Sequence, residues 1–121
     1  MIEILKGFPD NVAALACRGH VTRQDYETVL VPHVEALLER HDKVRLYYEI
    51  GADFTAIDPG AVWEDFKVGM AHLTHWERVA VVTDVDWIRH TMSLFGFVIP
   101  GDVRVFPMAE AAQARDWLTA G

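Results

Sequence analysis

The residues that could act as nucleophiles are few and stand apart in this sequence. Cys17 is the only cysteine and Ser93 the only serine. Cys17 lies among alanines in a short apolar run, a setting typical of a buried thiol that packs as a small hydrophobe. Ser93 falls inside a helical pattern and lacks the Gly-x-Ser-x-Gly turn of a serine hydrolase. We therefore assign no catalytic residue and expect a protein that is not an enzyme.

Histidines and acids offer a second kind of chemistry. His72 and His75 are three residues apart, which makes them neighbours on one helix face. A zinc site would need a third ligand, from His90 or from Asp84 and Asp86. This spacing matches no metal motif, and histidines at a helix end also interact favourably with the helix dipole. We expect no metal ion.

The pair Asp84 and Asp86 follows the carboxyl end of a predicted strand, where open α/β sheets place ligands. Two acids there could hold Mg²⁺ or serve as acid and base. Acids before a helix are also ordinary caps, and we favour capping. No glycine-rich phosphate loop follows any strand, so we expect no cofactor.

Apolar side chains provide the remaining candidate site. The second and third predicted helices carry more large apolar residues than one face against a sheet requires, and such a surplus indicates a groove, a pocket or an interface. Plain core packing explains part of it equally well. The expected ligand-binding residues are Tyr48 on the sheet side and Trp63, Phe66, Met70, Trp87, Met92 and Phe95 on the helices.

The elements that must position these residues are organised around the stretch 78–87. Arg78 to Thr83 is a β-branched run typical of a strand buried on both faces, and helical spacing begins at Trp87. The predicted strands are Met1–Lys6, Val12–Arg18, Val44–Ile50, Arg78–Thr83 and Val103–Phe106. The first two are joined by a short turn and must pair antiparallel, since a parallel crossover needs a dozen or more residues.

Four helices are expected between and after these strands. The first begins at Thr22, with Asp25 at capping-box spacing and a break near Val31 because Pro32 removes a backbone donor. The others begin near Pro59, Trp87 and Met108. Gly51 to Asp58 is expected to be a loop. Alternation of strands and helices after the first hairpin predicts right-handed crossovers and a mainly parallel, five-stranded sheet.

Composition limits the class of protein. The chain has 121 residues, 51% of them hydrophobic, which fits one domain over residues 1–121 with a real core. The net charge of -7 and scattered basic residues argue against a nucleic-acid partner. A single cysteine and the lack of a leader pattern predict a cytoplasmic protein, and no run is long enough for a membrane span.

Six stretches form a characteristic set in their order and spacing, namely Gly19–Glu27, Arg45–Glu49, Ala61–Lys67, Arg78–Trp87, Arg104–Pro107 and Ala114–Leu118. Together they resemble the bacterial SpoIIAA-like proteins of the STAS superfamily. The resemblance covers nearly the whole chain. It implies a SpoIIAA-like α/β fold, a βα superhelix with an added first strand, and kinship with CRAL-TRIO domains, which hold an apolar ligand between helix and sheet.

The sequence departs from the phosphorylated members of that superfamily at one place. Where anti-sigma-factor antagonists carry an Asp-Ser motif, this chain reads Asp58-Pro59-Gly60-Ala61, which has no hydroxyl group. The apolar surplus on the second and third helices, together with the resemblance, leads us to expect non-enzymatic binding of an apolar or lipid-like small molecule between helices and sheet. The alternative is a protein-interaction module or homodimer that uses the same surface without a phosphorylatable serine. The ligand and the partner stay open.

Overall fold

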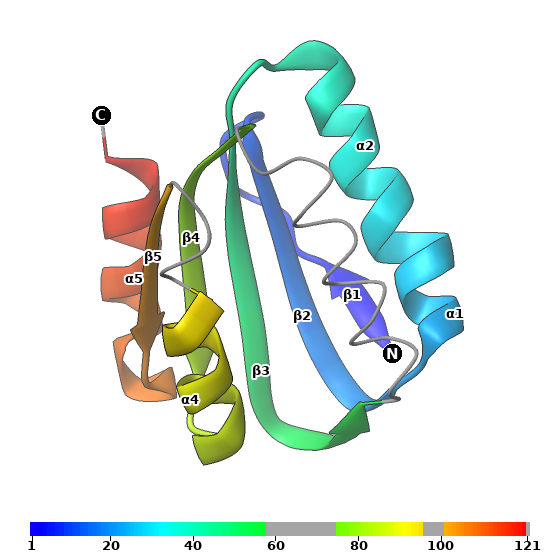
Figure 1. Cartoon of the computed structure of the whole chain (residues 1–121), viewed down its shortest axis with the longest axis vertical. Coiled ribbons are helices and arrows are strands. Elements are labelled where there is room, and N and C mark those ends of the chain that lie inside the picture. The colour runs from blue at the N-terminus through cyan, green and yellow to red at the C-terminus, as the bar shows by residue number, and fades with distance from the viewer. Residues whose placement is uncertain (58–74, 96–100, 121) are drawn as a thin grey trace.

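A computed structural model describes residues 1–57, 75–95 and 101–120 of the chain. Five strands form one sheet whose spatial order follows the chain order (Figure 1). They are β1 (Ile2–Ile4), β2 (Val12–Val21), β3 (Val44–Ile57), β4 (Trp76–Thr83) and β5 (Asp102–Phe106). β1 pairs antiparallel with β2, and every later pair is parallel. The mainly parallel sheet with an antiparallel first strand is therefore confirmed.

Three of the four predicted helices lie in the described residues. The first consists of α1 (Arg23–Asp25), η1 (Tyr26–Leu30) and α2 (Val31–Arg40), which follow one another without a gap. The other two are α4 (Asp86–Phe95) and α5 (Ala111–Thr119), the latter preceded by the 3₁₀ turn η3 (Met108–Glu110). The helix expected from Pro59 lies outside the described residues. No helix in the described part of the chain is long and apolar enough to cross a membrane.

The first helix is irregular where its break was expected. The turn of π-helix η1 ends at Leu30, and Pro32 occupies the first turn of α2. Proline has no N–H to donate to the preceding turn, so a wider hydrogen-bonding pattern is accommodated there. The start of this helix is also as predicted, because Thr22 and Asp25 form a reciprocal capping box.

Two strands run well beyond their predicted carboxyl ends. β2 runs through Gly19 to Val21, and β3 continues past Gly51 to Ile57, where a loop was expected. The two extensions pair with each other, with Val21 opposite Ile57. Backbone pairing between distant segments therefore overrides the glycine-containing local sequence, at the cost of a bulge at Gly19.

The sheet has a different partner on each face. α2 and α4 lie in front of it and α5 lies behind it in Figure 1. The front core includes Leu15, Val34, Leu37, Val81 and Ile88. The rear core includes Ala14, Tyr47, Ala80, Ala114 and Leu118. Side chains alternate between the two faces along β3, since Val44, Leu46, Tyr48 and Ile50 belong to the front and Tyr47 to the rear.

Candidate functional site

A small polar cluster lies inside the apolar front core. The Tyr48 hydroxyl accepts a hydrogen bond from Cys17 Sγ at 3.1 Å and forms a short hydrogen bond with the Tyr26 hydroxyl. All three side chains are buried, with exposed fractions of 7% for Tyr48, 1% for Cys17 and 0% for Tyr26. Buried polar groups of this kind fix orientation within an otherwise apolar site.

Each member of this cluster is held by a different element. Tyr48 is in the middle of β3, paired with Leu15 of β2 and Val81 of β4. Cys17 lies two residues beyond Leu15, so its side chain points to the same face of the sheet. Tyr26 is the first residue of η1, directly after the capping box, and its ring reaches from the helix down to the sheet.

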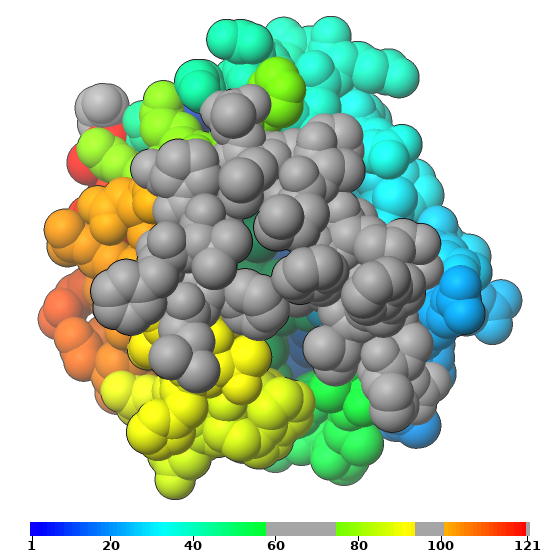
Figure 2. Space-filling view, viewed as in Figure 1, coloured from blue at the N-terminus to red at the C-terminus, as the bar shows by residue number. Residues whose placement is uncertain are grey.

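The surroundings of the cluster are apolar and not fully closed. Several side chains that pack on the front core keep part of their surface exposed, namely Leu46, Phe54, Ile57, Val85, Met92 and Val105. The molecular surface is recessed between α4 and the far end of β3, with atoms of the strands visible at its bottom (Figure 2). Helix α4 and the extended β3 therefore border a hollow on the front face.

The structure separates the predicted binding residues into three groups. Tyr48 is in the polar cluster, and Met92 is a partly buried member of the same front core. Trp87 points outward from α4 with 52% of its surface exposed, while its neighbour Ile88 is buried. Trp63, Phe66 and Met70 lie outside the described residues, as does the side chain of Phe95.

The sequence analysis missed the roles of Tyr26, Cys17 and Ile88. Packing of the Tyr26 ring in the front core accounts for its place on the helix but leaves its hydroxyl unexplained. A hydroxyl buried in a core needs a hydrogen-bonding partner. Two tyrosines at core positions, one in the first helix and one in the third strand, were therefore the sequence signal for this hydrogen bond.

A second buried tyrosine, Tyr47, lies in the rear core of the sheet. The Tyr47 hydroxyl donates to Glu49 Oε1 at 2.9 Å, and the Tyr47 ring packs on Phe8 with ring centroids 4.9 Å apart. Burial raises the pKa of Tyr47 strongly, and the hydrogen bond to Glu49 with its negative charge raises it further. The Arg115 guanidinium stacks over Phe8, 4.4 Å from its ring centroid, and donates to the Gly7 carbonyl. These contacts join the turn that contains Gly7 and Phe8 to β3 and α5.

Two arginines of the sheet fasten the last helix to that face. Arg45 donates to the carbonyls of Leu118 and Ala120 at 2.7 Å, and its guanidinium also pairs with Glu77. Arg78 donates to the carbonyls of Trp117 and Ala120 at 2.8 and 2.7 Å. These carbonyls are the acceptors that a helix leaves unpaired at its carboxyl end, so the arginines act as its cap.

The acids and histidines considered for metal binding are dispersed. The Asp84 carboxylate accepts a hydrogen bond from the Met108 amide at 3.1 Å, which ties the end of β4 to the start of η3. His75 Nδ1 lies 2.8 Å from the carbonyl of Asp42. Among the described residues, no three histidine, cysteine, aspartate or glutamate side chains are grouped closely enough to hold a metal ion. His72 lies outside them.

Comparison with known proteins agrees with this geometry. The family model described as SpoIIAA-like matches residues 12–119. A crystal structure of an uncharacterized protein of the DUF3478 family from Shewanella loihica PV-4, with a SpoIIAA-like fold, superposes with a TM-score of 0.74. Its sequence is 24% identical, and the match covers 98% of this chain and 92% of that one. No curated protein matches the chain.

Fold and sheet order thus define a small STAS-type α/β domain. The chain belongs to the SpoIIAA-like family, whose model spans all of the sheet except β1.

Proposed function

We propose that this SpoIIAA-like domain is a non-catalytic binding protein for an apolar or lipid-like small molecule, held between the helices and the front face of the sheet. The observation that carries the proposal is the buried Tyr26–Tyr48–Cys17 cluster, which lies in an apolar front core whose outer side chains are partly exposed. A mostly apolar lining with a few convergent polar groups is the usual composition of a small-molecule site. The cluster would face the polar end of such a ligand, and Met92 with Phe54 would contact its body.

Native and denaturing mass spectra of the protein, purified from the cells that make it, test this proposal first. Extra mass that is lost on denaturation is the expected result. Saturable binding of a fluorescent fatty acid, NBD-palmitate, and a rise in melting temperature with oleate, farnesol or dioleoylphosphatidylglycerol would support the same conclusion, because a ligand of the folded state stabilises it. A bare polypeptide mass together with no response to any of these probes would overturn it.

Met92→Gln and His90→Gln form a matched pair for locating the site. Met92 faces the front core from α4, whereas His90 is exposed on the same helix. Glutamine has nearly the shape of methionine but brings an amide whose desolvation is unfavourable in an apolar site. We expect Met92→Gln to weaken NBD-palmitate binding by about tenfold and His90→Gln to leave it unchanged. Equal affinities in both variants would place the ligand elsewhere.

A second candidate function, a protein-interaction module, rests on Trp87. It is half exposed on α4, and the other large apolar residues that are exposed in the described part are Met1 and Ile4 of the opposite edge. Tryptophan is enriched in interface hot spots. Light scattering should then show a dimer that Trp87→Ser converts to a monomer with an unchanged melting temperature. A wild-type monomer across the accessible concentration range would count against the homodimer.

A further inference from the structure

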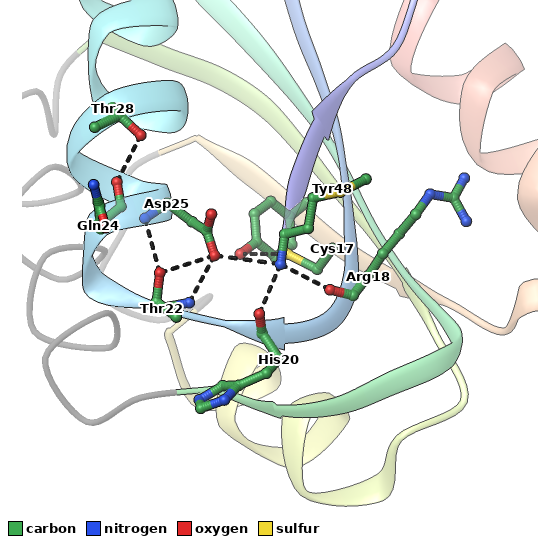
Figure 3. A network of polar contacts seen from close by, with 9 residues as sticks. Cys17, Arg18, His20, Thr22, Gln24, Asp25, Thr28 and Tyr48 are labelled. Carbon is green, nitrogen blue, oxygen red and sulfur yellow. Dashed lines mark hydrogen bonds and ion pairs between the residues drawn. The ribbon is translucent and has the colours of Figure 1, made fainter.

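The amino group of Met1 is enclosed by acceptors from two separate segments. It lies 2.9 Å from the Arg18 carbonyl, 2.7 Å from the His20 carbonyl and 3.3 Å from Asp25 Oδ2. The Met1 side chain, in contrast, is 68% exposed. Figure 3 shows Arg18, His20 and Asp25, from the end of β2 and the start of the helix, joined in one network of contacts. The amine is thus turned into the protein while the rest of the residue faces outward.

The two carbonyls converge because β2 is bulged between them. Gly19 has a φ of +55°, in the left-handed region that favours glycine, and the register with β3 shifts on either side of it. In a regular strand, the carbonyls of residues i and i+2 point to the same side but lie about 7 Å apart. Arg18 pairs with Met1 in the ladder, and the bulge at Gly19 brings the His20 carbonyl within hydrogen-bond distance of the same nitrogen.

The third acceptor, the Asp25 carboxylate, is held in place by contacts that do not involve the amine. Asp25 Oδ2 accepts hydrogen bonds from the Thr22 backbone N–H at 2.8 Å and from the Thr22 hydroxyl at 3.0 Å. Burial disfavours the charged form of Asp25, but these hydrogen bonds and the amino group hold its pKa below the ordinary value. A carboxylate therefore completes the group of acceptors.

Three acceptors match the three protons of a primary ammonium group. We propose that the Arg18 and His20 carbonyls and the Asp25 carboxylate form a specific site for a primary ammonium ion, filled by the α-amino group in a chain whose first residue is Met1. An acylated or extended nitrogen has one proton and no charge, so it retains the ladder contact to Arg18 and loses the other two. Acylation of this amine is thus a modification to which the fold is sensitive.

The site is coupled to the interior through the first turn of the helix. Asp25 both contacts the ammonium group and is the N3 residue of the capping box that starts α1. The next residue, Tyr26, is fully buried and bonded to Tyr48. Loss of the ammonium contact therefore loosens the cap, and the cap positions the tyrosine.

The test compares three forms of the protein: the free amine at Met1, the Nα-acetylated chain, and a chain with Gly-Ser added before Met1. Acetylation and extension should each lower the melting temperature by about 3–6 °C and increase hydrogen exchange over residues 22–30. Exchange in α5 serves as the internal reference and should not change. Unchanged melting and unchanged exchange over residues 22–30 would overturn the proposal.

Two substitutions test whether the loss of stability on acetylation depends on the Asp25 carboxylate. Asp25→Asn removes the charge that the amine contacts, whereas Glu27→Gln alters a nearby acid that pairs with Arg23 instead. In Asp25→Asn, acetylation should lower the melting temperature by less than half of the decrease seen in wild type. In Glu27→Gln, it should lower the melting temperature by the full wild-type amount. The same cost in both backgrounds would overturn the site. If Asp25→Asn does not fold, the wild-type exchange comparison still decides.

Discussion

Tyr47 and Tyr48 are adjacent in β3, yet their hydroxyl groups form hydrogen bonds on opposite faces of the sheet. Tyr48 meets Tyr26 and Cys17 at the front, and Tyr47 meets Glu49 at the rear. Both rings are buried, with exposed fractions of 4% and 7%. The pair therefore provides one substitution, tyrosine to phenylalanine, that can be made in either core with little change in volume.

The hydroxyl groups of Tyr26 and Tyr48 should contribute jointly to stability. Tyr26→Phe and Tyr48→Phe should each lower the free energy of unfolding by about 1–2 kcal/mol, because each leaves a buried partner with one hydrogen bond fewer. Urea denaturation of the double variant should show a loss smaller than the sum by roughly 0.5 kcal/mol or more. The control is Tyr26→Phe with Tyr47→Phe, whose losses should add.

Alkaline pH should destabilise the protein through Tyr47. The ordinary pKa of tyrosine is 10.0, and the pKa of Tyr47 in the folded state is raised well above it. The unfolded chain therefore loses this proton first, so the stabilising contribution is complete below pH 10 and is lost as the pH rises further. The free energy of unfolding should fall by up to about 1.4 kcal/mol per pH unit from this one group.

Urea denaturation between pH 9 and pH 11 measures that decrease, and Tyr47→Phe is the comparison. The variant should be less stable at pH 9 but should lose less stability on going to pH 11. Parallel curves for wild type and variant would mean that other groups account for the alkaline loss.

The arginine cap of α5 should control local opening of the last helix. Arg45→Met and Arg78→Met remove donors to the carbonyls of Trp117, Leu118 and Ala120 while keeping an apolar stem. We expect hydrogen exchange over residues 111–119 to rise, with a loss of about 1–3 kcal/mol in protection. Arg104→Met is the control, because Arg104 stacks on the Trp117 ring, 4.7 Å from its centroid, and pairs with Asp102 of its own strand.

Gly101 should tolerate no side chain. A Cβ atom there would collide with the Trp76 carbonyl oxygen and would lie 3.1 Å from that of Glu77, both of which are backbone atoms of β4. Gly101→Ala should therefore lower the melting temperature by several degrees, in keeping with a cost of about 1–3 kcal/mol for overpacking. Gly51→Ala is the matched control, since its nearest neighbours would be side-chain atoms at 3.5 and 3.8 Å. Equal melting of the two variants would contradict this account.

The faces of β3 and the start of the first helix could be predicted because both depend on local spacing. Alternation along Val44–Ile50 assigns each side chain to a face, and a hydroxyl three residues before an acid makes a capping box. The extension of β3 to Ile57 could not be predicted in this way. It depends on pairing with β2 across a bulge, and no local pattern records a partner more than thirty residues away.

The candidate site was harder to predict because α4 carries two apolar rows. Trp87 begins one and Ile88 with Met92 form the other, and helical spacing alone treats both as possible core faces. In the folded protein the row of Ile88 and Met92 faces the sheet, whereas Trp87 is exposed. The hydrogen bond between Tyr26 and Tyr48 joins a helix to a strand and likewise needed the assembled fold.

The arrangement of α5 has a consequence for how the protein emerges from the ribosome. Each strand pairs with the one made just before it, so the sheet can grow in the order of synthesis. The rear core, however, requires Ala114 and Leu118, and its cap joins Arg45 to a carbonyl 73 residues later. A nascent chain that has completed all five strands therefore still exposes one apolar face, and a chaperone would find its binding surface there until α5 has been made.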